Sequence, residues 1–584
     1  MQPAEEKKGM VSNMINIKRR KWKSMVAVLA AAAFITGCGS EQGNNAQEVT
    51  QEVAAGEQTA SDSASGVQTQ ESLSAESQIE IDKEFTASDL DVGYEESTAV
   101  KVTLNGDSAE ISGNGAKAEG NVVTISDEGT YVLSGVLTDG QIIVDAEDTD
   151  KVQLVLNGVT LSASDSAPIY IKNADKVFIT LEEGSENTLT DGAEYVQTDD
   201  NEVDAVIFSK ADLTINGSGV LNITGNYKHG IASKDDLVIT GGTFNITAVK
   251  DALNGKDCVK IKEGIFNLTV TDGNGIQSKN GDDATKGYVY ICGGEINVLN
   301  GQEGIEGTAL VIDGGTIDIT VQDDGLNAAS ASSSEETEET GGFGGGGSEM
   351  ANDTNCYIAI NGGSLTIDAG GDGIDSNGSI YVTGGTTYVT GPADNGNSGL
   401  DYNGSAQITG GIFVVTGSSG MAQGFSDSST QYSLLYNLAS AASAGTETTL
   451  TDADGNVIIS VTPKKQYQSV LISTPELQKD ATYTLTSGDQ TAEITLSGVV
   501  TSNGQQSGFG GGQGKMNRDG ERPDVSQMPQ GGERPDGTQT PADGEMPDIP
   551  SDAEMPEDGQ TPPDGQTPPE NGGPSQDDET ELPE

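Results

Sequence analysis

The segment ALVIDGGTIDITVQDDGLNA (residues 309–328) contains the pattern that decides the fold. Apolar residues alternate with other residues before a Gly-Gly step, at Leu310 and Ile312. They alternate again after the step, at Ile317 and Ile319, and an acidic residue then precedes Gly-Leu. Period 2 on both sides of a turn predicts two short strands that each bury one face. The Gly-Gly step supplies the positive φ or the close backbone approach that the turn requires.

The same pattern recurs between residues 213 and 415. Its turn steps begin at residues 217, 241, 263, 293, 314, 362, 384 and 410, so the intervals are 24, 22, 30, 21, 48, 22 and 26 residues. A third apolar element follows each pair of strands, at Ile231, Leu253, Ile276, Ile305, Leu326, Ile374 and Leu400. A period of this length predicts a repeat array. The 48-residue interval holds either one repeat with a large insertion or two repeats, one of them unrecognisable.

These repeats predict an all-β fold, namely a right-handed parallel β-helix with three short strands per coil. A single repeat cannot close a core, whereas coils stacked about 4.8 Å apart can. The sequence has no helical periodicity to cover a sheet, and a propeller blade needs about 40 residues and four strands. We therefore expect a β-helix at residues 85–428, with irregular N-terminal coils and a Gly/Ser/Glu-rich insertion at about 329–352.

Composition separates the rest of the chain into segments. Residues 39–84 are expected to be a disordered tether, and residues 501–584 a disordered tail rich in Gly, Pro and acidic residues. Residues 429–500 break the repeat and predict a C-terminal β cap, with a helical turn at 433–438. The irregular strands before residue 190 are expected to protect the other end of the array.

The N-terminus predicts export and lipid anchoring. A basic group at residues 18–23 precedes a short apolar stretch, which ends in Ile35-Thr36-Gly37-Cys38. This ending resembles a bacterial lipobox, so residues 1–38 are expected to be a lipoprotein signal peptide with Cys38 as the lipidation site. The predicted location is the extracellular face of the bacterial cell membrane, with membrane contact through the lipid anchor only. Ordinary secretion with cleavage near Gly37 is the alternative.

The net charge excludes one class of partner. The 584 residues contain 29 Lys and Arg against 91 Asp and Glu, a formal net charge of −62. Such a chain is not expected to bind nucleic acid or to dock on an anionic membrane surface. It is compatible with divalent cations.

Acidic and amide residues flank the third strand of each repeat and form two columns in a stacked array. The first column precedes the strand's Gly or Ala and comprises Asp251, Asn274, Glu303, Asp324, Asp372 and Ser398. The second column follows the strand's Ile or Leu and comprises Asn254, Gln277, Glu306, Asn327, Asp375 and Asp401. Carboxylates about 5 Å apart repel by roughly 3 kcal/mol per pair at an effective dielectric near 20. Raised pKa values, solvent or a cation must relieve that repulsion.

Hard oxygen ligands in a crowded array suit Ca²⁺, which takes 6–8 oxygens. The stretch Gly370-Gly371-Asp372-Gly373-Ile374-Asp375 also matches the Gly-Gly-x-Gly-x-Asp calcium nonapeptide, although it occurs once. A solvated ladder of turn residues is the alternative. The predicted metal ligands are Glu303, Glu306, Asp323, Asp324, Asn327, Asp372, Asp375 and Asp401.

No catalytic set stands out in the predicted solenoid. Its residues include no Arg, and His229, the single His of the chain, is expected to be a satisfied turn residue. A Lys base (Lys250, Lys262, Lys279 or Lys286) and a glycosidase carboxylate pair remain open, so a polysaccharide lyase or glycoside hydrolase is the enzymatic alternative. The residues favour a protein without catalysis.

The Gly-Gly-x-φ-x-φ repeats (φ here an apolar residue), the Asp/Glu-Gly-Ile/Leu steps, the lipobox and the Gly-Phe-Gly-Gly-Gly stretches (342–346 and 508–512) form a recognisable set. In these features, residues 85–500 resemble the clostridial carbohydrate-binding β-helix lipoproteins. The resemblance implies a pectate-lyase-like fold, calcium, and binding of cellulose and polygalacturonate without need for catalysis. It implies here a cell-surface, calcium-dependent binder of polysaccharide, and a structural adhesin or envelope spacer is the further alternative.

Aromatic residues limit what kind of sugar surface the chain offers. The one Trp, Trp22, lies in the predicted signal peptide, so stacking on a glucan would depend on outward tyrosines. The predicted carbohydrate-binding residues are Tyr290, Tyr357, Tyr381 and Tyr402, with Tyr288 and Tyr388 as further candidates. This departure disfavours crystalline cellulose and leaves calcium bridging to uronates, which requires no aromatic platform.

Overall fold

The computed structural model describes residues 79–331 and 352–504. The predicted signal peptide with Cys38, most of the predicted tether and insertion, and the tail from residue 505 lie outside the described residues. Within the described ranges, no helix is long and apolar enough to cross a membrane.

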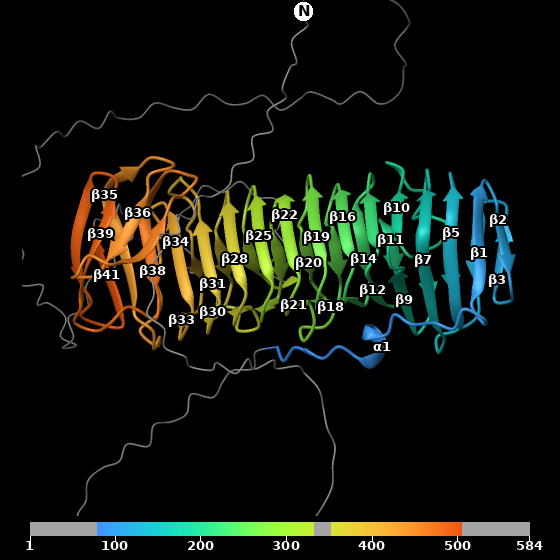
Figure 1. Ribbon diagram of the computed structural model, residues 1–584, viewed down its shortest axis with the longest axis horizontal. Helices are drawn as coiled ribbons and strands as arrows, with labels where there is room; N and C mark the ends of the chain where they lie inside the picture. The colour runs from blue at the N-terminus through green and yellow to red at the C-terminus, as the bar shows by residue number, and fades with distance from the viewer. Residues whose placement is uncertain (1–78, 332–351, 505–584) are drawn as a thin grey trace, which may run out of the picture. The chain divides into compact units, whose positions relative to one another are not determined.

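The described residues form one short helix and a long series of strands (Figure 1). The helix is α1 (Ala87–Leu90). The first strands are β1 (Val100–Gly106), β2 (Ala109–Ser112), β3 (Ala116–Glu119), β4 (Val122–Ile125), β5 (Gly129–Leu137), β6 (Gln141–Asp145), β7 (Lys151–Ser162), β8 (Ile169–Asn173), β9 (Lys176–Leu181), β10 (Glu186–Thr190) and β11 (Ala205–Ser209). The next are β12 (Asp212–Gly217), β13 (Val220–Thr224), β14 (His229–Ser233), β15 (Asp236–Ile239), β16 (Thr243–Ala248), β17 (Leu253–Gly255), β18 (Cys258–Ile261), β19 (Ile265–Val270), β20 (Ile276–Ser278), β21 (Tyr288–Ile291), β22 (Glu295–Asn300), β23 (Ile305–Gly307), β24 (Ala309–Ile312), β25 (Thr316–Val321) and β26 (Leu326–Ala328).

The remaining strands follow the insertion. They are β27 (Tyr357–Ile360), β28 (Ser364–Ala369), β29 (Ile374–Ser376), β30 (Ser379–Val382), β31 (Thr386–Thr390), β32 (Asp401–Tyr402), β33 (Ala406–Ile408), β34 (Ile412–Gly417), β35 (Ser433–Ala442), β36 (Thr448–Thr451), β37 (Val457–Val461), β38 (Tyr467–Ser473), β39 (Thr482–Ser487), β40 (Gln490–Thr495) and β41 (Val500–Gly504).

Equivalent strands of successive repeats pair in parallel and in register. Between the two repeats that flank the insertion, for example, β24 pairs with β27, β25 with β28 and β26 with β29. Leu310 therefore lies beside Ile358, and Ile317 beside Leu365. Because the side-chain period is 2, this register keeps the alternating apolar residues, such as Leu310 and Ile312, on the face of the main core. The repeat with the 48-residue interval is one repeat, since β24–β26 pair directly with β27–β29 across the insertion.

The backbone geometry requires a glycine at both positions of the Gly-Gly step. Gly315 has φ +94°, a conformation that residues with a Cβ rarely adopt. A Cβ on Gly314 would lie 2.5 Å from the carbonyl oxygen of Cys292 in the preceding repeat. The first glycine thus permits close approach of the neighbouring backbone, and the second makes the turn.

One continuous apolar core runs through the stacked repeats. Aliphatic side chains at equivalent positions of successive repeats line this core. The phenyl rings of Phe244 and Phe266 stack within it, with centroids 4.8 Å apart and planes 3° apart. Both rings are fully buried. Burial of such a side chain stabilises the fold by about 2–3 kcal/mol relative to exposure.

The structure corrects the predicted fold class. The chain is all-β, but its strands form large mixed sheets of 25, 12 and 4 strands, and none of these sheets is closed. The prediction of a right-handed parallel β-helix with three short strands per coil is therefore wrong. One physical reason is that β7, a strand of 12 residues, pairs with both β9 and β10, so the first two strands of the repeats belong to a single sheet. Antiparallel pairs such as β1–β2 and β34–β38 make that sheet mixed.

The C-terminal region also differs from the expectation in one detail. The predicted helical turn at 433–438 is wrong, because β35 begins at Ser433 and pairs with β38 and β41. Backbone pairing on both sides has overridden the local preference of this segment. The four-stranded sheet consists of β36, β37, β39 and β40.

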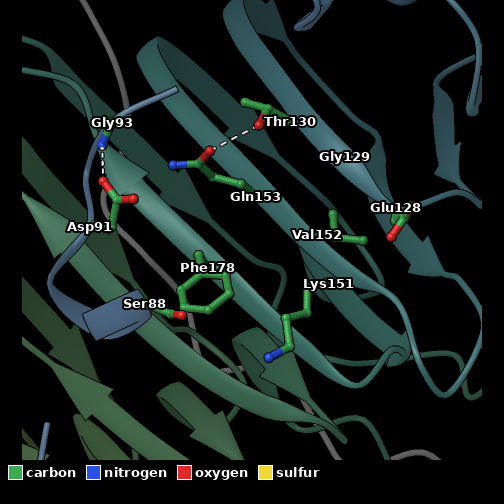
Figure 2. A pocket seen from close by; sticks show the side chains of 10 residues that line it. All are labelled: Ser88, Asp91, Gly93, Glu128, Gly129, Thr130, Lys151, Val152, Gln153 and Phe178. Carbon is green, nitrogen blue, oxygen red and sulfur yellow. Dashed lines mark hydrogen bonds between the residues drawn. The ribbon is translucent and has the colours of Figure 1, made fainter. Parts of the chain in front are cut away.

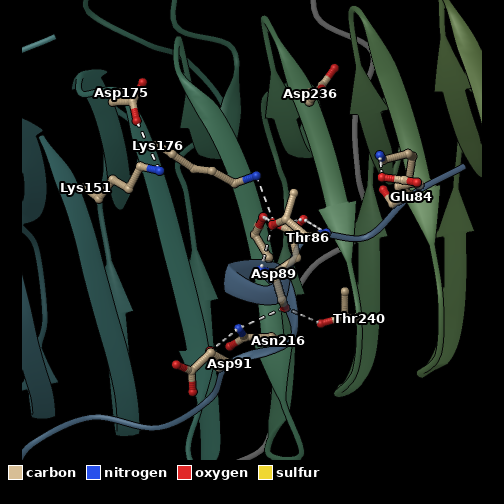
Figure 3. A network of polar contacts seen from close by, with 12 residues as sticks. Glu84, Thr86, Asp89, Asp91, Lys151, Asp175, Lys176, Asn216, Asp236 and Thr240 are labelled. Atoms are coloured by element: carbon tan, nitrogen blue, oxygen red, sulfur yellow. Dashed lines mark hydrogen bonds and ion pairs between the residues drawn. The ribbon is translucent and has the colours of Figure 1, made fainter. Parts of the chain in front are cut away.

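Residues 79–97, here called the N-terminal strap, lie along strands of the 25-stranded sheet (Figure 3). Thr86 caps α1 and forms a capping box with Asp89. The Asp89 carboxylate is 2% exposed, forms an ion pair of 2.8 Å with Lys176 and accepts a hydrogen bond of 2.7 Å from Thr214. Burial acts to raise the pKa of Asp89, but the bonds from Lys176, Thr214 and Thr86 lower it to about 2. The strap is thus fixed by a buried, fully paired carboxylate, and residues 79–84, which the sequence assigned to the tether, belong with it.

Candidate functional site

The first column is held together by side-chain to backbone hydrogen bonds. The Asp251 carboxylate accepts a bond of 2.9 Å from the backbone N–H of Asn274, whose Oδ1 accepts one of 3.2 Å from Glu303. Farther along, Asp324 accepts a bond of 2.6 Å from the N–H of Asp372, and Asp372 accepts one from Ser398. Each of these side chains therefore reaches the equivalent residue of the next repeat.

The second column follows the register of the 12-stranded sheet. Successive Cα partners are Asn254, Gln277, Glu306, Asn327, Asp375 and Asp401. Its first members are amides that bond one another, as Asn254 donates to Gln277 at 3.0 Å. Its later members are acids except for Asn327, so carboxyl groups gather toward Asp375 and Asp401.

Three of the predicted ligands converge closely. Carboxylate oxygens of Asp324, Asp372 and Asp375 lie within 4.8 Å of one another. Asp323 joins them, because its Oδ1 and the Oδ1 of Asp324 lie 2.2 and 2.5 Å from the point where a Cβ on Gly371 would be attached. We call these four residues the carboxylate cluster. Gly371 is required there because any side chain would enter the space between the two carboxylates.

Burial and mutual repulsion raise the pKa of most acids at this site. The pKa of Asp324 rises to about 8, first through burial and then through the charges of Asp372 and Asp323. Burial and the neighbouring Asp372 and Asp401 raise the pKa of Asp375 to about 7. Burial is also the main cause for Asp372, whose pKa rises to about 6. Protons thus compete with any cation for this site near neutral pH.

Two buried oxygens beside the cluster have no hydrogen-bond partner among the described residues. They are Oε2 of Glu303 and Oδ1 of Asn327, whose side chain is 9% exposed. The Asn327 amide donates a bond of 2.9 Å to Glu303 of the preceding repeat, and Asn327 stands in register with Asp375 of the next repeat. Burial and the nearby Glu306 raise the pKa of Glu303 to about 8. A buried acceptor without a donor costs roughly 1–3 kcal/mol, which a bound cation would offset. The residues present therefore fit a hard divalent cation such as Ca²⁺.

Two further predicted ligands have other partners. Glu306 forms an ion pair with Lys279 and accepts bonds of 2.6 Å from Asn274 and from Gln277. Asp401 accepts bonds from Gln423 and from the N–H of Tyr402. Burial raises the pKa of Asp401. The site is therefore centred on fewer residues than the eight expected from the sequence.

Three of the predicted sugar-binding tyrosines, Tyr290, Tyr357 and Tyr381, lie on the 25-stranded sheet beside the N-terminal strap, whereas Tyr402 lies in β32 of the 12-stranded sheet. Tyr290 and Tyr357 are buried against Ile79, Ile81 and Phe85 of the strap. The Tyr357 hydroxyl donates a bond of 3.0 Å to the carbonyl of Ile79. Stacking of these two rings on a sugar stays a prediction and would require the strap to leave.

The two other predicted tyrosines are also partly covered. Tyr381 packs against the apolar cluster that Tyr290 and Tyr357 form with the N-terminal strap. Tyr402 packs against the main core and donates a bond of 2.6 Å to the carbonyl of Gly424. A flat, open aromatic platform is therefore not formed by these residues in the described structure.

Other polar features were missed by the sequence reasoning. Asp212, Asp235 and Asp236 bring carboxylate oxygens within 4.8 Å of one another, and burial with the charge of Asp212 raises the pKa of Asp235 to about 6. Asp235 and Asp236 are adjacent in sequence and directly precede or begin β15, which was the available signal.

A hollow beside the strap, lined by Ser88, Lys151 and Phe178 among others, is shown in Figure 2. Two hydrogen bonds of 2.9 Å join lining residues, from Thr130 to Gln153 and from the N–H of Gly93 to Asp91. It contains no member of either column.

Part of the chain is similar to known proteins. Residues 119–396 match a family model described as "Carbohydrate-binding domain-containing protein". A relative of the same description from Acetivibrio thermocellus is 42% identical over 128 residues, which cover 22% of this chain and 45% of the relative. The chain thus spans less than half of that relative's length. Residues 119–396 are accordingly homologous to a carbohydrate-binding domain family.

A solved structure is also similar to part of the chain. It is described as a polysaccharide lyase-like protein from C. thermocellum, in a gadolinium derivative. The sequence identity is 34%, the match covers 40% of this chain and 93% of that chain, and the TM-score is 0.37.

Proposed function

We propose that this protein binds acidic polysaccharide of the polygalacturonate class, that it does so through Ca²⁺ held by the carboxylate cluster, and that binding is its function without catalysis. The observation that carries the proposal is the convergence of Asp324, Asp372 and Asp375 within 4.8 Å. It occurs within the 119–396 region that is homologous to a carbohydrate-binding domain family.

The chemistry of the donor set supports calcium. The cluster supplies carboxylate oxygens, and Asn327 supplies an amide oxygen that is buried without a donor. Ca²⁺ takes 6–8 oxygen ligands in flexible geometry, whereas Mg²⁺ demands a near-ideal octahedron. When bound, the ion supplies positive charge that a sugar carboxylate can share with the protein.

The residues around the cluster would orient such a ligand. Asp323 is exposed and stands at the outer side of the cluster, so a sugar carboxylate can approach there. Asp375 is a residue of β29 and stands in register with Asn327, and the Asp372 carboxylate accepts a hydrogen bond from the backbone N–H of Ser398. A neutral glucan has no carboxylate to complete the coordination, so the proposal predicts preference for uronates.

Retention in affinity gels tests the proposal. Full-length protein is run through gels with polygalacturonate or with a neutral glucan, in Ca²⁺ or in chelator, beside Asp375→Asn and the control Asp318→Asn, an exposed carboxylate on β25. We expect retention only by polygalacturonate with Ca²⁺, and its loss in Asp375→Asn alone. Equal retention in chelator, or none at all on polygalacturonate, would overturn the proposal.

The same samples separate the enzymatic and structural alternatives. Product with ultraviolet absorbance or new reducing ends would establish a lyase or a hydrolase. Three lysines considered as bases are held by carboxylates: Lys250 by Asp272, Lys279 by Glu306 and Lys286 by Asp257. The bond from Asp257 raises the pKa of Lys286, which favours the charged ammonium over the free base.

We also propose that Cys38 is lipidated and that the protein is anchored at the extracellular face of the bacterial membrane. The support is the sequence Ile35-Thr36-Gly37-Cys38 after a basic and apolar segment. Detergent partition of cell extracts tests this. Wild type is expected in the detergent phase and Cys38→Ala in the aqueous phase or in the unprocessed form, and identical behaviour of the two would refute anchoring at this residue.

A further inference from the structure

A pocket lies toward the opposite end of the first column from the carboxylate cluster. It has a volume of about 460 Å³, and its lining includes Lys228, His229, Lys250, Asp251 and Gln302. Lys250 directly precedes Asp251 of the first column, and Lys228 directly precedes His229, the first residue of β14, which holds the equivalent position before the Gly in the preceding repeat. The pocket therefore lies along the first column, which also contributes Asp324 and Asp372 to the proposed calcium site.

The residues just outside the first column form a third ladder of their own. The backbone N–H of Lys250 donates to the carbonyl of Lys228, that of Gln302 to Gly273 and that of Asp323 to Gln302. Gly273 lies against the backbone of Lys250, because a Cβ there would meet its carbonyl carbon at 2.6 Å. Read along the stack, this ladder changes from cationic through neutral to anionic.

The acids inside the pocket are already engaged. Asp251 Oδ2 lies 3.1 Å from His229 Nδ1 and accepts a bond of 2.6 Å from Asn254. Burial acts to raise the pKa of Asp251, but His229 and these bonds lower it. A buried carboxylate that is satisfied in this way offers no free charge to a ligand.

The ammonium groups are more available. Lys228 has no ion pair with a described residue and lies 5.3 Å from the ring centroid of Tyr227. Lys250 pairs at 2.5 Å with Asp272, whose side chain is 64% exposed and thus solvated. Such surface pairs contribute only about 0–1 kcal/mol and are readily exchanged for another anion. In a chain of net charge −62, two neighbouring ammonium groups at one pocket mark an anion site.

We propose that this pocket binds a carboxylate of the polysaccharide directly, as a second subsite for a uronate chain whose other carboxylates meet the cation at the carboxylate cluster; the inference rests on the proposed function. Lys250 and Asp323 are three steps apart on the third ladder, which at about 4.8 Å per step is about 14 Å. One oligouronate chain laid along the ladder can reach both. The two subsites use opposite charges, so a neutral glycan satisfies neither.

Titration calorimetry with an oligogalacturonate tests this inference. The variant is full-length Lys228→Met/Lys250→Met, and the control is Lys101→Met/Lys117→Met, which removes the same charge from exposed lysines far along the chain. Losing two charge-assisted contacts is expected to weaken oligogalacturonate binding at least about tenfold. The control is expected to bind as wild type. Methyl-esterified oligogalacturonate, which lacks the charge, is expected to bind equally weakly to all three proteins.

Ca²⁺ titration and thermal melting of the same proteins complete the test. The lysine variant is expected to keep the Ca²⁺ affinity and melting temperature of wild type, which shows that it is folded and that the cation site is intact. Unchanged oligogalacturonate affinity in that variant would overturn the second subsite and leave the calcium proposal standing. Failure of wild type to bind oligogalacturonate in Ca²⁺ would overturn both.

Discussion

Replacing Asp375 with Asn should stabilise the protein in the absence of calcium. Asp375 lies within 4.8 Å of the carboxylates of Asp324 and Asp372, and each like-charge pair at that distance costs about 3 kcal/mol at an effective dielectric near 20. The change in pKa from its ordinary value of 3.8 to about 7 corresponds to roughly 4 kcal/mol when the group is fully ionised. Because the site is partly solvated, we expect a gain of about 2–4 kcal/mol in the free energy of unfolding.

The gain should depend on pH with a defined sign. A raised pKa means that the folded protein binds a proton that the unfolded chain releases, so the carboxylate costs stability increasingly as pH rises from about 4 through 7. Asp375→Asn removes that cost. The stabilisation should therefore be small at pH 4.5 and complete at pH 8.

Calcium should reverse the effect. A ligand that binds only the folded state stabilises it by about 2.7 kcal/mol at one hundred times its Kd. Wild type should gain this increment at pH 8, while Asp375→Asn, which lacks one ligand, should gain little. Because the variant starts about 2–4 kcal/mol ahead, wild type should overtake it only as Ca²⁺ approaches about one thousand times the Kd, where the increment is about 4.1 kcal/mol.

Urea unfolding at pH 4.5 and pH 8, each with chelator and with Ca²⁺, measures all four quantities. Asp318→Asn, an exposed carboxylate on β25, is the matched control and should change stability by less than about 0.5 kcal/mol. The reasoning is refuted if Asp375→Asn is no more stable than wild type in chelator at pH 8, or if Ca²⁺ stabilises both proteins equally.

Three further substitutions test other parts of the structure. Gly371→Ala should weaken Ca²⁺ binding in calorimetry because its Cβ would meet Asp323 and Asp324 oxygens at 2.2 and 2.5 Å; unchanged affinity would contradict the cluster geometry. Lys176→Met should cost about 3–5 kcal/mol by leaving Asp89 buried and unpaired, and hydrogen exchange should show the loss confined to residues 79–97; exchange as slow as in wild type would refute the role of this pair. Phe266→Ala should lower the free energy of unfolding by about 3–5 kcal/mol, and a loss below 1 kcal/mol would argue against the phenyl stack.

The buried positions and the register of the repeats could be predicted from the sequence because the side-chain period of a strand is fixed. Leu310, Ile312, Ile317 and Ile319 are all buried, as alternation around the Gly-Gly step requires. The same regularity allowed residues 48 positions apart, such as Asn327 and Asp375, to be assigned to one column. Register follows from sequence wherever one face must be apolar.

The way in which the strands join into sheets could not be predicted from the sequence, and the predicted fold class was wrong for this reason. Whether β7 bends or continues through 12 residues depends on its pairing with both β9 and β10, which no local pattern encodes. The N-terminal strap was missed because residues 79–85 are few and follow a long polar segment. Its signals were the alternating Ile79 and Ile81 and the capping sequence from Thr86 to Asp89.

Side-chain partners account for the remaining differences at the site. Glu306 was grouped with the other acids because its position in the second column is equivalent to theirs. Its pairing with Lys279 depends on how a flexible ammonium group folds back, which spacing does not specify. The tyrosines were assigned an outward direction, but only the folded strap determines that Tyr290 and Tyr357 are covered.

A crystal structure of the full-length protein grown with Ca²⁺ at pH 8 tests the central claim most directly. We predict a peak of anomalous scattering with oxygens of Asp324, Asp372 and Asp375 at about 2.3–2.6 Å, and with the Oδ1 of Asn327 among its neighbours. A map in which these carboxylates surround only water, while calcium sits on other residues or nowhere, would contradict the account.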